Sequence, residues 1–178
     1  MGSMRLLFVT SFYPPFTGGG SSRIHDFSRL LASIGFEVTV LTFSPFQSLL
    51  KTPSSKEAKV IRLPTLGFKH PLDQIFLGFV GTMLINAARA QDFVIASVPM
   101  GEPCIGAFLA CSILNRRAVV DIRDEWEDAV IYRTRRLLTR NLYLLYRRLF
   151  NSIYRKSGFV ATVTPTLVKR TRQRGVAN

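Results

Sequence analysis

The feature that most constrains the fold is a regular alternation of short apolar runs with segments of helical periodicity. The apolar run at 5–12 is followed by a glycine-rich stretch, and then by apolar residues at helical spacing over 24–34. Gly35 stands where a helix-terminating glycine belongs, and the β-branched and aromatic run at 36–43 predicts a second strand. The opening of the chain therefore predicts a strand, helix, strand unit with a right-handed crossover.

The same alternation continues along the rest of the chain. Further strands are predicted at 59–65, 93–97, 117–124 and 158–165, and helices at 72–90, 105–115, 132–156 and from 166 onward. Strands that alternate with helices form a mostly parallel sheet with both faces covered. We therefore expect one α/β domain over 4–178, and we interpret 1–3 as a cloning scar.

The composition indicates a globular domain with a strongly basic surface. Hydrophobic residues make up 47% of the chain, enough for a core, whereas the formal net charge is +13. Such a surface attracts polyanions such as nucleic acid, anionic lipid or phosphorylated substrates. The longest apolar run, at 75–88, is too short for a membrane span and predicts a buried helix. Cys104 and Cys111 lack metal-ligand spacing, so we expect small buried hydrophobic residues in a reducing cytosol.

Four segments are candidates for a ligand site because each follows a strand of the predicted sheet. In parallel sheets, ligands bind beyond the carboxyl ends of the strands. This rule selects the segments 11–22, 97–103, 121–128 and 162–166. In the first segment, three consecutive glycines let the backbone approach a phosphate, and the N-terminus of the following helix favours its charge. A turn that is merely rich in glycine is the simpler alternative.

Two familiar phosphate-binding motifs do not fit the glycine segment. Arg23 occupies the place of the third glycine in a G-x-G-x-x-G pattern that starts at Gly18. The second predicted strand also lacks the terminal acidic residue that binds a ribose. No lysine follows the glycines, as a P-loop would require. We therefore do not expect a nicotinamide-dependent dehydrogenase or a P-loop protein.

Three stretches, in the right order, resemble the family 4 glycosyltransferases of GT-B fold. They are the strand, YPP motif, glycine loop, helix and strand at 4–43, "ASVPMGEPCIGAFL" followed by "AVVDIRDEW", and "FVATVTPTLVKRTRQRGV". The resemblance implies a Rossmann-like, three-layer domain that forms the acceptor-side, N-terminal half of a two-domain enzyme. The family's second domain, which holds most of the nucleotide-sugar, has no counterpart here. We therefore expect an N-terminal half that is inactive by itself.

The resemblance also implies site residues for a retaining, hexosyltransferase-type enzyme with a UDP- or GDP-linked donor. The donor phosphates are expected against Gly18, Gly19, Gly20 and Ser21. The expected catalytic residues, as orienters of the acceptor hydroxyl and the sugar, are Asp121, Arg123 and Asp124. A structural ion-pair network with Asp124 as a helix cap is the open alternative for this last group. Acceptor contacts are assigned to Tyr13, Glu102 and Trp126, and no metal or separate cofactor is expected.

The segment 132–156 carries much of the positive charge. It contains no acidic residue, and Leu, Tyr, Phe and Ile recur beside Arg at near-helical spacing. A basic, aromatic, amphipathic helix suits the interface of an anionic membrane. The residues assigned to membrane contact are Arg135, Arg136, Arg140, Arg147 and Arg148. A helix that packs on the sheet and leaves its arginines solvated is the alternative, and nucleic acid is not expected because no recognition motif accompanies the charge.

These observations lead to one expected function and one alternative. We expect the acceptor-side domain of a glycosyltransferase that serves an envelope polysaccharide, a lipopolysaccharide or a lipid-linked acceptor. Its expected place is cytoplasmic, peripheral on the inner face of the cell membrane. The alternative is a non-catalytic α/β module that binds anionic lipid or a partner subunit through the arginine-rich helix.

Overall fold

A computed structural model describes residues 3–45, 58–66, 71–98 and 101–176. In this part of the chain six strands form one parallel sheet with the order β3-β2-β1-β4-β5-β6. The strands are β1 Arg5–Val9, β2 Glu37–Pro45, β3 Lys59–Thr65, β4 Phe93–Val98, β5 Arg117–Ile122 and β6 Phe159–Thr162. The helices are α1 Gly19–Ser33, α2 Pro71–Ala88, α3 Glu102–Leu114, α4 Trp126–Arg133, α5 Leu137–Lys156 and α6 Pro165–Gln173. The expected α/β class, with interleaved helices and a Rossmann-like strand order, is confirmed.

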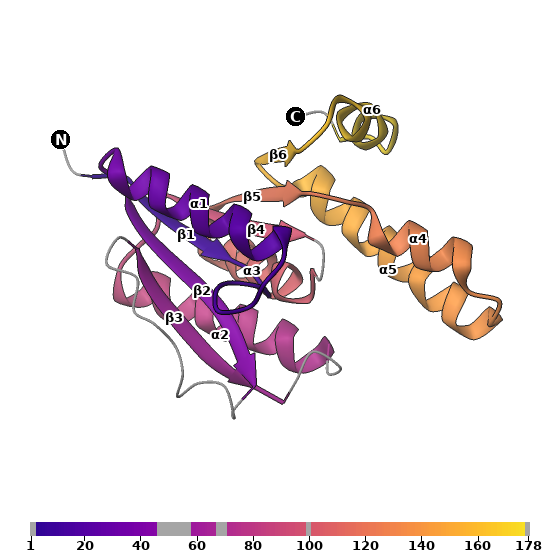
Figure 1. Cartoon of the computed structure of the whole chain (residues 1–178), viewed down its shortest axis with the longest axis horizontal. Helices are drawn as coiled ribbons and strands as arrows, with labels where there is room; N and C mark the ends of the chain where they lie inside the picture. The colour runs from indigo at the N-terminus through magenta and orange to yellow at the C-terminus, as the bar shows by residue number, and fades with distance from the viewer. Residues whose placement is uncertain (1–2, 46–57, 67–70, 99–100, 177–178) are drawn as a thin grey trace.

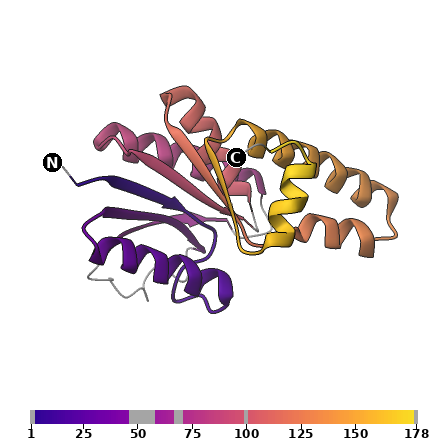
Figure 2. The same cartoon turned by 90° about the horizontal axis from the view of Figure 1, so that it is seen from above.

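The two faces of the sheet are covered by different helices, as Figures 1 and 2 show. Successive side chains of a strand point to opposite faces. In β1, Leu6 and Phe8 pack with Ile24 of α1, whereas Leu7 and Val9 pack in the core that includes Ala107 of α3. The central strands are therefore apolar on both faces, which explains why their sequences read as continuous hydrophobic runs.

A third cluster anchors the C-terminal half of α5 to the sheet. Phe150, Ile153 and Tyr154 are buried against residues of β4 and β5, including Val98 and Ile122. The ring of Phe150 packs so closely on the turn after β4 that a Cβ at Gly101 would overlap it. Gly101, at the start of α3, and the base of α5 are thus fixed to one another.

The predicted helix at 132–156 is in fact the second arm of a helical hairpin. The chain is extended at Thr134 and Arg136, which separates α4 from α5. Figures 1 and 2 show both helices leaving the body together, on the side toward which the strands point. The sequence carries no glycine or proline at this break, so its composition did not predict it.

Helix α2 is less buried than the sequence predicted. The run at 75–88 was expected to be buried, but α2 exposes Leu72, Phe76 and Leu84 on its outer side. None of the described helices combines the length and the apolar character needed to cross a membrane.

Cys104 and Cys111 are buried as expected, and burial raises the pKa of each thiol to about 12, so both stay neutral.

Candidate functional site

The four candidate segments lie next to one another at the carboxyl edge of the sheet. They follow β1, β4, β5 and β6, which are consecutive neighbours in the strand order. The order reverses between β1 and β4, and such a switch point is where open α/β sheets bind ligands. Helix α1 starts at this point, so its N-terminus opens onto the neighbouring ends of β4 and β5.

The three glycines have three different environments. Gly18 is the residue before α1 and has a φ of 130°, a conformation that residues with a side chain rarely adopt. Gly20 is covered by the guanidinium of Arg123, which a Cβ at this position would overlap. Gly19 has an ordinary φ, and no atom within the described residues lies within 4 Å of the place of its Cβ. The backbone conformation therefore explains Gly18 and the contact with Arg123 accounts for Gly20, whereas neither explains Gly19.

Arg123 is held over the start of α1 by the backbone of β4. Its main-chain N–H and its Nε both donate to the carbonyl of Val98, at 3.1 and 3.2 Å. Burial lowers the pKa of the Arg123 guanidinium from its ordinary value, and Asp121 and Asp124 partly offset this. An arginine still remains protonated in a protein. A cation is thus fixed beside a helix N-terminus, where the helix dipole favours an anion.

Two buried hydroxyl groups add polar surface at the same edge. Ser21, in the first turn of α1, donates its main-chain N–H to Gly18, while its Oγ has no hydrogen-bond partner within the described residues. The Oγ of Ser97, at the end of β4, is likewise buried and unpartnered in that part of the chain. Buried polar groups are normally satisfied, so both hydroxyls are available to a further hydrogen-bond partner at this edge.

Asp121 is occupied by an ion pair within the domain. Both of its carboxylate oxygens accept hydrogen bonds from Arg23 of α1, at 2.9 and 3.2 Å. Only 5% of the Asp121 side chain is exposed, and the guanidinium of Arg23 lies over the ring of Phe27. The pair joins β5 to α1 across the switch point, which makes Asp121 a positioning residue for the start of α1.

Asp124 is the carboxylate of this segment that stays available. It is exposed, and within the described residues it forms no ion pair or hydrogen bond. It is also not the helix cap that the alternative required, because the residue before α4 is Glu125 and no side chain caps that helix. An unpaired carboxylate therefore lies directly after Arg123.

The residues assigned to the acceptor lie in three different environments. Tyr13 is buried and its hydroxyl is hydrogen-bonded to Ser28 at 3.2 Å, so it supports the loop from inside. Glu102 begins α3, and its buried Oε2 has no partner within the described residues. Trp126 begins α4, but its side chain lies outside the part that the structure describes. Their contacts with an acceptor stay a prediction.

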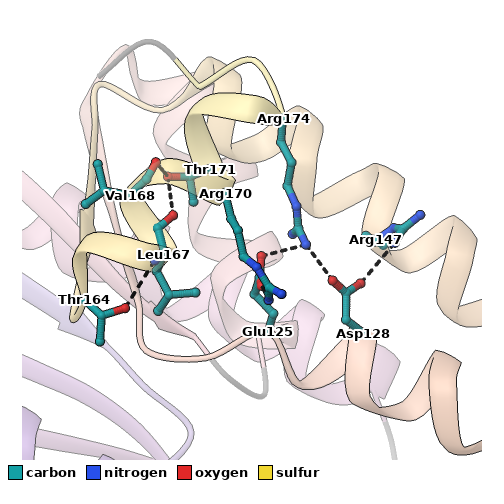
Figure 3. A network of polar contacts seen from close by, with 9 residues as sticks. All are labelled: Glu125, Asp128, Arg147, Thr164, Leu167, Val168, Arg170, Thr171 and Arg174. Atoms are coloured by element: carbon teal, nitrogen blue, oxygen red, sulfur yellow. Dashed lines mark hydrogen bonds and ion pairs between the residues drawn. The ribbon is translucent and has the colours of Figure 1, made fainter.

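An ion-pair network ties α6 to the hairpin, as Figure 3 shows. Arg174, directly after α6, contacts Glu125 at 2.6 Å and Asp128 at 2.7 Å, and Arg170 of α6 also pairs with Glu125. Asp128 in turn accepts from Arg147 of α5 at 3.1 Å. We name this set the foot network. The foot network thus gives Glu125 and Asp128 a structural role, whereas the alternative concerned Asp121, Arg123 and Asp124.

A comparison with protein families matches residues 18–178 to the description "Glycosyl transferase 4-like domain". The chain belongs to this family. The match begins at Gly18 and includes the switch-point residues and the foot network. A comparison with curated proteins gives no match.

In this glycosyl transferase 4-like domain, the start of α1 lies beside groups of the kind that attract an anion. These groups are the first N–H groups of α1, the hydroxyl of Ser21 and the guanidinium of Arg123. Asp124 lies one residue beyond Arg123, on the same edge of the sheet. The predicted donor and catalytic residues are therefore neighbours in the fold, although their roles stay predictions.

Sequence reasoning missed several residues of this glycosyl transferase 4-like domain. Arg23 was considered only as a mismatch to a glycine pattern, and the foot network was not predicted, since its one assigned member, Arg147, was placed at the membrane. The members of the foot network are Glu125, Asp128, Arg147, Arg170 and Arg174. The available signal was the clustering of the acids, because 125–128 is the last acidic stretch of the chain and three arginines follow in α6 and its C-terminus.

Proposed function

We propose that this glycosyl transferase 4-like domain takes part in a retaining transfer of a hexose from a UDP- or GDP-linked donor. The acceptor is an envelope polysaccharide, a lipopolysaccharide or a lipid-linked sugar. A C-terminal nucleotide-sugar domain completes the donor site. The observation that carries the proposal is Gly19, whose missing side chain nothing in the described part of the domain explains.

The distal phosphate of the donor lies against Gly19. A phosphate there accepts hydrogen bonds from the first N–H groups of α1, and the helix dipole stabilises its charge. Arg123 supplies a positive charge, and the hydroxyl of Ser21 supplies a further donor that is otherwise unpartnered. As the sugar leaves, the diphosphate gains negative charge, and fixed donors in a closed cleft stabilise this charge most effectively.

Asp124 orients the acceptor hydroxyl or the transferred sugar. Its carboxylate is exposed and unpaired within the described residues, whereas Asp121 is held by Arg23. Glu102 is a second carboxylate at this edge, at the start of α3. The domain works at the inner face of the cell membrane, as a peripheral protein whose basic surface faces anionic lipid.

The test is sugar transfer by the protein expressed in its native source, using labelled UDP- and GDP-sugars and the source's own membranes. Asp124→Asn is expected to lower transfer about a hundredfold, as expected for a group that positions a reacting hydroxyl. Gly19→Ala is expected to lower transfer at least tenfold while the free energy of unfolding stays unchanged or rises by up to about 1 kcal/mol, since alanine favours helix.

Two variants are matched controls. Asp26→Asn removes an exposed carboxylate on the outer side of α1, and Gly158→Ala adds a methyl group at the far end of the sheet, before β6. Both are expected to keep transfer within twofold. Equal losses in the controls, or no transfer by the unmodified protein with any donor, would contradict the proposal. The second result would favour the non-catalytic lipid-binding or partner-binding module.

A further inference from the structure

The outer surface of α5 is apolar where the helix has left the body. Four leucines lie on one side of the helix, at alternating spacings of four and three residues, and form a stripe. Their side chains are exposed by 85% for Leu138, 63% for Leu142, 62% for Leu145 and 43% for Leu149. The residues of α5 that reach the core begin at Tyr146 and Phe150. The stripe is therefore not the core-facing side of an ordinary packed helix.

The tip of the hairpin combines large apolar groups with free positive charge. Tyr132 and Leu137 are 86 and 73% exposed, on either side of the turn between α4 and α5. Arg135 and Arg136 lie in this turn, Arg140 follows one turn later, and all three are exposed. Monomeric proteins rarely leave a contiguous apolar surface of this kind to water.

These arginines lie in a stretch of the chain without acidic residues. After Asp128 the sequence contains no acidic residue, and Asp128 itself is held by Arg147 and Arg174. Within the described residues, Arg135, Arg136, Arg140 and Arg148 form no ion pair. Beyond Asp128 the hairpin thus offers guanidinium groups without an ion pair in the described residues, beside an exposed leucine stripe and in a stretch without acidic residues.

We propose that the α4–α5 hairpin is a docking arm for an anionic lipid bilayer. The leucines of the stripe and the residues of the tip enter the boundary of the acyl chains. The neighbouring arginines bind the phosphates of the headgroups. Charge selects this occupant, because residues 129–156 are basic and contain no acid, and a second copy of the chain would bring two such surfaces together. The outer side of α2 differs, since it exposes leucines without unpaired arginines.

The arm is fixed to the body, so docking sets the orientation of the domain. Phe150, Ile153 and Tyr154 hold its base in the core, and the foot network ties it to α6 (Figure 3). The arm leaves the body on the side toward which the strands point (Figures 1 and 2). Docking therefore brings the carboxyl edge of the sheet toward the membrane. The advantage of this orientation for a lipid-linked acceptor rests on the proposed function. Docking itself does not depend on the proposed function.

The test is flotation of the chain with vesicles of phosphatidylglycerol and phosphatidylcholine in equal amounts, compared with phosphatidylcholine alone. Arg135→Gln/Arg136→Gln is expected to weaken binding to the anionic vesicles about thirtyfold, from the usual contribution of a basic residue near such a surface. Leu142→Ser is expected to weaken it about tenfold, because a buried leucine is lost. Phosphatidylcholine vesicles are expected to bind weakly.

Each variant has a control at the same kind of position. Arg116→Gln/Arg117→Gln removes two adjacent exposed arginines at the amino end of β5, with the same change in charge. Leu84→Ser removes a leucine of α2 that is 64% exposed, against 63% for Leu142. Both controls are expected to stay within threefold of the unmodified chain. Circular dichroism checks folding, and Leu145→Ser replaces Leu142→Ser if that variant unfolds.

Three outcomes would overturn the docking arm. They are equal binding to both kinds of vesicle, equal losses in the controls, and absence of vesicle binding. If absence of binding is accompanied by a dimer in sedimentation that Leu142→Ser dissociates, the stripe is an interface between copies. Vesicle binding needs neither donor nor acceptor, so its failure leaves the sugar-transfer proposal standing, and absence of transfer leaves docking standing.

Discussion

Arginines at the base of the hairpin and arginines at its tip differ in their partners. At the base, Arg147 and Arg174 contact Asp128 at 3.1 and 2.7 Å. At the tip, Arg135 and Arg136 are exposed and have no carboxylate partner within the described residues. The same residue type therefore supports the fold in one region and offers unneutralised charge in the other.

The position of the few acidic residues creates this difference. The chain has 24 lysines and arginines but only 11 aspartates and glutamates, and none of the acids lies beyond residue 128. The acids at 121–128 neutralise arginines that reach them from α1, α5 and α6. Arginines further along the arm form no ion pair with these acids within the described residues. The net charge of the whole chain does not show which arginines are paired and which are not.

The largest effect is expected at Asp121, the most buried carboxylate among the ion pairs of the described residues. Asp121→Asn keeps the size of the side chain but leaves Arg23 without its carboxylate. The free energy of unfolding is expected to fall by about 3 kcal/mol, as when one partner of a buried ion pair is removed. Urea denaturation measures this loss, and Asp26→Asn on the exposed side of α1 is the control. A loss below about 1 kcal/mol would mean that the pair does not hold α1 to β5.

A smaller loss is expected at the foot network. Asp128 is 17% exposed and serves two arginines, so Asp128→Asn weakens two hydrogen bonds to charged groups. The free energy of unfolding is expected to fall by about 2 kcal/mol, measured again with urea. Vesicle binding should persist, because the tip is unchanged. Loss of vesicle binding in the folded variant would show that the arm depends on the foot network for its orientation.

The fold was predictable because its signals are local and repeated. Apolar runs separated by helical patterns indicated a parallel sheet, and the switch-point rule placed the four segments at one edge. The environments of the glycines were not predictable. Gly20 is covered by Arg123, about a hundred residues later in the chain, and such a contact follows from tertiary packing alone.

The packing of the arm was likewise not predictable from the sequence pattern. The basic, apolar pattern of 132–156 predicted an amphipathic helix, and α5 has that character. The pattern did not separate a helix packed along its whole length from one packed only at its C-terminal half. That difference depends on Phe150 meeting the turn at Gly101, and on the break before Leu137. Membrane contact was also assigned to Arg147, which the structure pairs with Asp128.

The smallest effect on stability is expected at the tip, where it is most informative. Arg140→Gln removes an exposed guanidinium without a carboxylate partner in the described residues, so the free energy of unfolding should change by less than about 0.5 kcal/mol in urea. The same variant should bind anionic vesicles about fivefold more weakly, and this difference should shrink at high salt, where surface charges are screened. Stability would then depend on the arginines at the base of the hairpin, and vesicle binding on those at its tip. A loss of stability comparable to that of Asp128→Asn would mean that Arg140 has a structural partner and that the tip is not free to dock. A salt-independent difference in vesicle binding would mean that the arm binds through its leucines alone.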